Sequence, residues 1–150
     1  MSSNQIEGVL PPNISHCKDL ETLDLMENRI TGKIPGEFSK LTRLEVLKLG
    51  KNRFYGEIPS SLANVSSLTT LNFGTNTLSG VIPDELGRLR KLEELDITIN
   101  NITGMLFIYL KFFVTFLLIN IKFLDYSHPC PQTLISFTLY PKHQNSYFAT

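Results

Sequence analysis

The sequence predicts a solenoid, an α/β repeat fold in which successive coils stack and their short strands form one parallel sheet. The first observation is a 24-residue step shared by leucine and asparagine, at Leu23, Leu47, Leu71 and Leu95 and at Asn28, Asn52, Asn76 and Asn100. The second is that glycine and proline keep this step, at Gly32, Gly56, Gly80 and Gly104 and at Pro35, Pro59 and Pro83. A fixed period of about 20 to 50 residues is the signature of a stacked array.

Each coil begins with a half-buried strand. In "LEVLKLGKN" the alternation of residue types directs Leu44, Leu47 and Leu49 inward and the residues between them outward. Strands of successive coils are expected to pair in parallel, about 4.8 Å apart. The asparagine that ends each strand can both donate to and accept from the backbone groups that the turn leaves open, so the four asparagines are expected to form a ladder.

The second part of each coil changes its local rule because the chain turns a corner. Gly56 suits a backbone position with positive φ or a close approach to the next coil. "EIPSSL" is expected to stay extended as far as Pro59, which lacks an N–H and disfavours helix in the residue before it. A spacing of three then predicts a short 3₁₀ or helical turn on the convex side, at Leu62, Val65 and Leu68.

This organisation predicts three regions. Residues 1–104 form the repeat array, with one incomplete coil before about four complete ones. In that first coil, Cys17 occupies the slot that leucine or valine fills later, which predicts a small buried core residue. Residues 105–124 form an apolar segment without the period, and residues 125–150 form an irregular tail.

The apolar segment "MLFIYLKFFVTFLLINIKFL" has three interpretations. As a helix it would be about 30 Å long, enough to cross a bilayer, although Lys111 within it is costly. Its richness in phenylalanine, leucine, isoleucine and tyrosine, together with the sudden loss of period, also fits the translation of an intron. The third interpretation is a divergent last coil.

Composition and charge exclude several classes of function. Fourteen basic and fourteen acidic residues give no general attraction to nucleic acid or to acidic membranes. Two cysteines are too few for a disulfide framework, and they lack zinc-ligand spacing. The first residues lack the basic and apolar regions of a secretory signal. With no base or ligand spaced usefully from the three histidines, we expect no catalytic, metal or cofactor site.

The pattern L-x-x-L-x-x-L-x-L-x-x-N-x-h-x-G-x-I-P-x-x-L in residues 20–104 resembles the plant-type extracellular leucine-rich repeat, with "GKIPGEF", "GEIPSSL" and "GVIPDEL" as its I-P segments. Residues 58–104 are similar to the ectodomains of plant leucine-rich-repeat receptor-like kinases. The resemblance implies a right-handed superhelix with a parallel concave sheet and a second sheet at the I-P segments. It also implies recognition of a peptide or co-receptor, outside the cell or at the plasma membrane.

The main interpretation is a binding module that is a fragment of such an ectodomain. Two alternatives remain open. The chain has no G-x-G-x-x-G, H-R-D or D-F-G motif, so we expect no enzyme activity in it. It could instead belong to a transmembrane receptor Ser/Thr kinase whose kinase domain lies outside this chain. It could also be a short membrane-tethered or soluble repeat protein that competes with full receptors.

The outward strand positions are the candidates for ligand contact. One set shares a register across four strands, at Asp24, Lys48, Asn72 and Asp96. Asp24 is expected beside Lys48, and Glu27 beside Lys51. The plainer interpretation is a set of cross-strand pairs, each contributing at most about 1 kcal/mol. Further ligand-contact candidates lie just past the strands, at Arg29, Arg53 and Tyr55.

Three N-x-S/T sequons are candidates for N-glycosylation, at Asn13, Asn64 and Asn101. All three occupy non-leucine positions, so we expect them to face solvent. Modification would require entry into the secretory pathway.

Overall fold

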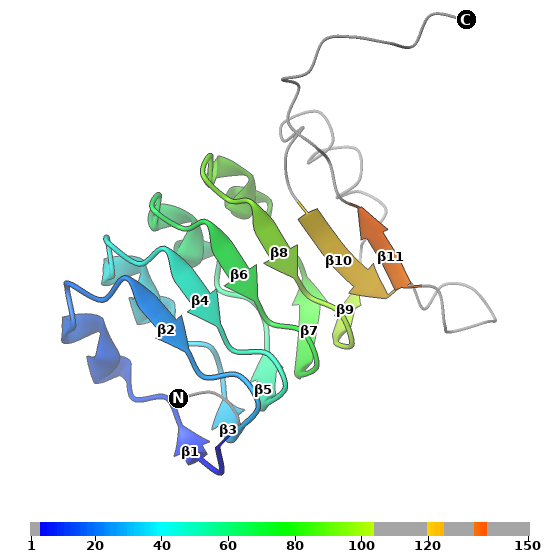
Figure 1. Ribbon diagram of the computed structural model, residues 1–150, viewed down its shortest axis with the longest axis horizontal. Coiled ribbons are helices and arrows are strands. Elements are labelled where there is room, and N and C mark those ends of the chain that lie inside the picture. The colour runs from blue at the N-terminus through cyan, green and yellow to red at the C-terminus, as the bar shows by residue number, and fades with distance from the viewer. Residues whose placement is uncertain (1–3, 104–119, 125–133, 138–150) are drawn as a thin grey trace, which may run out of the picture.

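The computed structural model describes residues 4–103, 120–124 and 134–137. One strand from each complete coil enters the main sheet, which runs diagonally across the front of Figure 1. Its strands are β2 (Thr22–Asp24), β4 (Val46–Lys48), β6 (Thr70–Asn72), β8 (Glu94–Asp96), β10 (Asn120–Leu124) and β11 (Leu134–Phe137). They lie in the order β11-β10-β8-β6-β4-β2, parallel throughout except for the antiparallel pair β10 and β11.

A second parallel sheet forms after the corner in each coil. Its strands are β1 (Glu7–Val9), β3 (Arg29–Gly32), β5 (Arg53–Gly56), β7 (Thr77–Val81) and β9 (Asn101–Thr103). The resemblance placed this sheet at the I-P segments, but its strands end just before them. Proline has no N–H to donate to a strand ladder, which accounts for the displacement. Gly56 has the expected positive φ, at 80°.

The predicted turns are 3₁₀ helices, and the strands of the two sheets together with these helices enclose the core. The helices are η1 (Pro12–His16), η2 (Gly36–Lys40), η3 (Ser60–Asn64) and η4 (Asp84–Arg88), each with a proline at its N-cap. The core is apolar and continuous from coil to coil. Phe38, Phe54 and Phe73 are fully buried in it, and each contributes roughly 1.5–3 kcal/mol by leaving water.

The four periodic asparagines bond one coil to the next. The Asn76 Nδ2 donates to the Leu49 carbonyl (3.1 Å) and the Phe73 carbonyl (3.0 Å), and its Oδ1 accepts from the Phe54 N–H (2.9 Å). Asn52 and Asn100 make the same kinds of bond in their coils, and the Asn28 Oδ1 accepts from the first described coil. These amides serve backbone groups at the corner, where neither sheet can.

Cys17 corrects the sequence-based expectation, because it is exposed rather than buried. The residues in its slot in the next two coils, Leu41 and Val65, are fully buried. Both belong to the core that runs from coil to coil. Within the described residues no coil covers the outer side of the first one, so the same slot faces solvent there.

The expectations for residues 105–119 and for most of the tail lie outside the described residues. Residues 120–124 form strand β10, so this part of the apolar segment is extended rather than helical. Asn120 lies opposite Glu94 of β8. Among the helices of the described residues, none has the length and apolar character needed to span a membrane.

Candidate binding surface on the main sheet

The outward positions at the ends of the main strands form one row across four coils. Cα pairing places Asp24 opposite Lys48, Lys48 opposite Asn72, and Asn72 opposite Asp96. We call these four residues the strand-end row. Each is the last residue of its strand and follows a leucine that packs in or against the core. The strands therefore pair in the predicted register.

Two members of the row are already engaged with each other. The Asn72 Nδ2 donates to the Asp96 Oδ2 (3.2 Å), and the Asn72 Oδ1 accepts from the Gly74 N–H (3.2 Å). The Asp96 Oδ1 accepts from both the N–H and the hydroxyl of Thr98, at 3.0 and 2.8 Å. Asn72 is only 8% exposed. Asn72, Asp96 and Thr98 thus form a hydrogen-bonded polar surface, which we call the bonded floor. Most of their hydrogen-bonding groups are already used within it.

Glycine in the preceding coil makes room for this floor. A Cβ at Gly74 would lie 2.7 Å from the Asp96 Oδ1, and a Cβ at Gly50 would collide with the Asn72 Oδ1. Real Cβ atoms do not approach oxygen so closely. The two glycines thus leave room for the side chains of Asn72 and Asp96 in the following coil.

The other half of the row consists of Asp24 and Lys48, which pair across β2 and β4. The Asp24 Oδ1 accepts from the Met26 N–H at 3.0 Å. Within the described part of the chain, no ion pair forms between Asp24 and Lys48, although they are neighbours as expected. The other expected pair does form, with the Lys51 Nζ 2.6 Å from the Glu27 Oε1. Lys48 is therefore the one cation of the row, and it is not neutralised by an ion pair within the described residues.

A feature that sequence reasoning missed runs beside the row. The residue before each ladder asparagine has a left-handed backbone, at Glu27, Lys51, Thr75 and Ile99, with φ between 50° and 58°. This conformation is unusual for β-branched residues and costs roughly 1–3 kcal/mol. The four residue types share no chemistry, so nothing in the sequence pattern signalled the conformation.

Arg29, Arg53 and Tyr55 lie away from the strand-end row. All three belong to β3 or β5 of the second sheet. Arg29 is paired with Glu7 at 3.0 Å, and Tyr55 is 49% exposed, opposite Thr77 of β7. The structure thus divides the sequence-predicted ligand contacts between two separate surfaces.

The three sequon asparagines are exposed, and none lies on the main sheet. Asn13 is in η1, Asn64 ends η3, and Asn101 begins β9 of the second sheet. The strand-end row therefore carries none of the three sequons. Within the described residues there is no group of three or more histidine, cysteine, aspartate or glutamate side chains placed to hold a metal ion.

Comparison with known proteins places these coils in a family. The family model described as "Leucine-rich repeat region" matches residues 2–130. The chain belongs to the leucine-rich-repeat family. None of the curated proteins compared matches it.

Solved structures show the same repeat in plant receptor ectodomains. The Arabidopsis receptor kinase HAESA, solved with the peptide hormone IDA and the co-receptor SERK1, is 37% identical with a TM-score of 0.66. The match covers 68% of this chain but only 17% of that one. The ectodomain of the receptor kinase SOBIR1 from Arabidopsis thaliana is 35% identical (TM-score 0.66), over 69% of this chain and 57% of that one. The leucine-rich-repeat region is thus similar to plant receptor kinase ectodomains.

A similar repeat array also occurs in a protein that is not a receptor. A plant ice-binding protein is 32% identical, with a TM-score of 0.67, over 69% of this chain and 34% of that one. The repeat fold alone therefore does not specify what such a chain binds, and the argument for function has to come from its outward side chains.

Proposed function

We propose that this chain is a binding module from a plant receptor-like kinase ectodomain and that the strand-end row contributes to recognition of a peptide or co-receptor. The single observation that carries the proposal is the Lys48 ammonium in the centre of this row. It has no ion-pair partner among the described residues. The similarity to HAESA, whose structure includes a peptide hormone and a co-receptor, supports the same class of ligand.

The chemistry of the row favours an acidic group on the ligand. Asn72 and Asp96 satisfy each other and the turn, so neither has to be desolvated without a partner when a ligand approaches. A carboxylate placed against Lys48 would form a charge-assisted hydrogen bond, which is roughly twice as strong as a neutral one. Lys48 would then supply the charge contact, and the bonded floor beside it would supply a preformed surface.

The module's setting is part of the same proposal. We place it outside the cell or at the plasma membrane, with Asn13, Asn64 and Asn101 as glycosylation sites that do not obstruct the row. Phosphotransfer would be the task of a Ser/Thr kinase domain in a longer parent protein.

The test uses the IDA peptide and the SERK1 ectodomain as probes, measured by biolayer interferometry against the full chain and two charge-reversal variants. Lys48→Glu changes the row. Lys40→Glu makes the same charge change in η2 on the exposed convex side. We expect Lys48→Glu to weaken binding of at least one probe by about tenfold, which corresponds to about 1.4 kcal/mol, and Lys40→Glu to leave it unchanged. Equal losses in both variants, or no binding of either probe, would overturn the proposal.

A further inference from the structure

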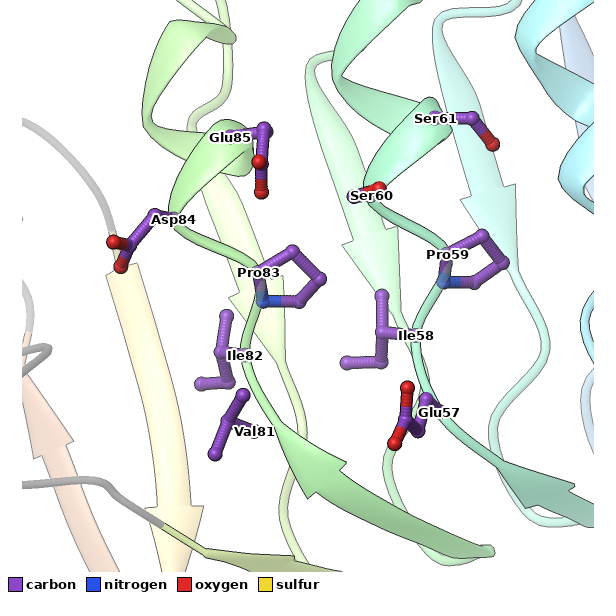
Figure 2. Close-up of a pocket in the computed structure, with 10 residues that line it drawn as sticks. All are labelled: Glu57, Ile58, Pro59, Ser60, Ser61, Val81, Ile82, Pro83, Asp84 and Glu85. Atoms are coloured by element: carbon purple, nitrogen blue, oxygen red, sulfur yellow. The ribbon is translucent and has the colours of Figure 1, made fainter.

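A groove lies between the I-P segments of two successive coils, on the side of the molecule where the second sheet ends. Residues 57–61 and 81–85 line it, and its volume is about 760 Å³. Figure 2 shows the two segments running side by side, with each residue of one segment level with its counterpart in the other. None of the strand-end row lines this groove.

The apolar part of the groove is rigid. Ile58 and Ile82 are 2% and 4% exposed, so the core holds both segments in place from below. Above them the rings of Pro59 and Pro83 are partly exposed, and proline restricts the backbone on both sides. Val81 is 59% exposed at one end of the groove. An aliphatic side chain lying here would bury apolar surface without first ordering the groove.

The polar part of the groove has a single sign of charge. Glu57, Asp84 and Glu85 line it, and none of its ten lining residues is lysine, arginine or histidine. No ion pair involves Glu57 or Glu85 within the described residues. The Glu57 stem lies across Gly80, where a Cβ would come within 2.8 Å of the Glu57 Cγ. Close packing against the glycine limits the positions that this carboxylate can take.

Glu57 and Asp84 belong to these two coils and not to the repeat, whereas Glu85 has an acidic counterpart two coils earlier. The isoleucine and proline of the I-P segment recur in three coils because they fill the core and direct the turn. One coil earlier, however, Lys33 stands at the position of Glu57, and Gly36 stands at the position equivalent to Asp84. Since the same fold forms with a cation or a glycine at these positions, stacking of the coils does not require the acids.

We propose that this groove docks an extended basic peptide segment of a protein partner. The cationic heads of two arginine or lysine side chains lie at Glu57 and Glu85. Their aliphatic stems lie on Val81 and the proline rings, as long basic side chains commonly do on apolar surface. Arginine fits better than lysine because its planar guanidinium can meet a carboxylate with two hydrogen bonds.

The test measures fluorescence anisotropy of a labelled peptide, Gly-Arg-Ala-Ala-Arg-Gly, titrated with the full chain. The double variant Glu57→Gln/Glu85→Gln removes two carboxylates from the groove and keeps their shape. The control Glu37→Gln/Glu93→Gln removes two charges elsewhere, and Glu37 occupies in its own coil the position of Glu85. We expect the first pair to weaken binding by about tenfold or more and the second pair to change it by less than about twofold.

Several results would overturn the proposal. Equal losses in the two double variants would show general charge attraction rather than docking. A peptide with citrulline in place of arginine should bind at least tenfold more weakly. Equal binding would show that the groove carboxylates do not recognise the positive charge of arginine. Displacement of the peptide by millimolar Ca²⁺ at constant ionic strength would identify a cation site instead. Lys48→Glu should leave peptide binding intact, so failure of the strand-end row and failure of the groove are distinguishable.

Discussion

The ladder asparagines offer a sharp test of what holds the coils together, and Asn76 is the best placed of them. Replacing it with alanine leaves the Phe54 N–H without the amide oxygen that it bonds at 2.9 Å, in a residue that is fully buried. The two carbonyls that Asn76 serves each keep a second donor, because the neighbouring ladder asparagine also bonds them. The loss therefore comes mainly from one unsatisfied buried N–H.

An unsatisfied buried N–H costs about 1–3 kcal/mol, so we expect Asn76→Ala to lower the free energy of unfolding by about 2–3 kcal/mol. Asn28→Ala is the matched control in the first described coils. There the orphaned donor is the N–H of Ile6, a half-buried residue that water can reach, so the expected loss is about 1 kcal/mol or less. The two substitutions remove the same side-chain atoms from asparagines that are about equally buried, and they differ chiefly in how far water can reach the orphaned N–H.

Urea unfolding followed by circular dichroism measures both losses. With a slope of about 1–3 kcal/mol per molar urea for small proteins, the midpoint of Asn76→Ala should fall by about 0.7–3 M and that of Asn28→Ala by about a third of that amount. Equal shifts in the two variants would refute the argument that burial sets the cost. A shift for Asn76→Ala of less than about 0.3 M would refute the role of the ladder itself.

Three further substitutions test residues in the turns that follow the main strands. Gly74→Ala should lower the free energy of unfolding by about 1–3 kcal/mol, because its Cβ would lie 2.7 Å from the Asp96 Oδ1; a thermal melt that is unchanged would contradict the contact. Ile99→Gly should raise the free energy of unfolding by about 1 kcal/mol, since it relieves a β-branched residue at φ 50° that is 48% exposed. Urea midpoints measure this, and a decrease would show that the lost apolar contact and the flexibility of glycine outweigh the strain. Lys51→Ala should cost less than about 1 kcal/mol, because its ion pair with Glu27 is solvent-exposed; a larger loss, or one that persists in 1 M salt, would show that the pair does more than screened charges can.

The sequence predicted the architecture because each coil repeats the same physical problem. A leucine must face the core, an asparagine must bond the backbone at the corner, and a proline must start the 3₁₀ turn, so these residues return at one step. The register of the strand-end row followed from the same step. Residues whose identity changes from coil to coil carry no such signal, which is why the left-handed positions and the groove acids were not predicted.

The remaining predictions depended on where a residue lies in the stacked array, which the repeat spacing alone does not give. Cys17 occupies a core slot by its spacing but is exposed, because burial depends on a covering coil and not on the residue itself. Arg29, Arg53 and Tyr55 follow their strands closely in the chain, yet the corner at each asparagine carries them onto a different sheet. The Asn72–Asp96 hydrogen bond joins residues 24 positions apart, and the small size of Gly74 makes room for it.

The sequence by itself determined the leucine-rich-repeat fold, the length of the coil and the residues that face its interior, because these answer constraints that recur within every coil. Only the tertiary structure decided which outward side chains remain available. Among the described residues, stacking leaves Lys48 without an ion pair, engages Asn72 with Asp96, and brings Glu57 and Glu85 to one groove. The physical reason is that availability depends on what the neighbouring coil places beside a residue, and that contact lies about 24 residues away in the chain.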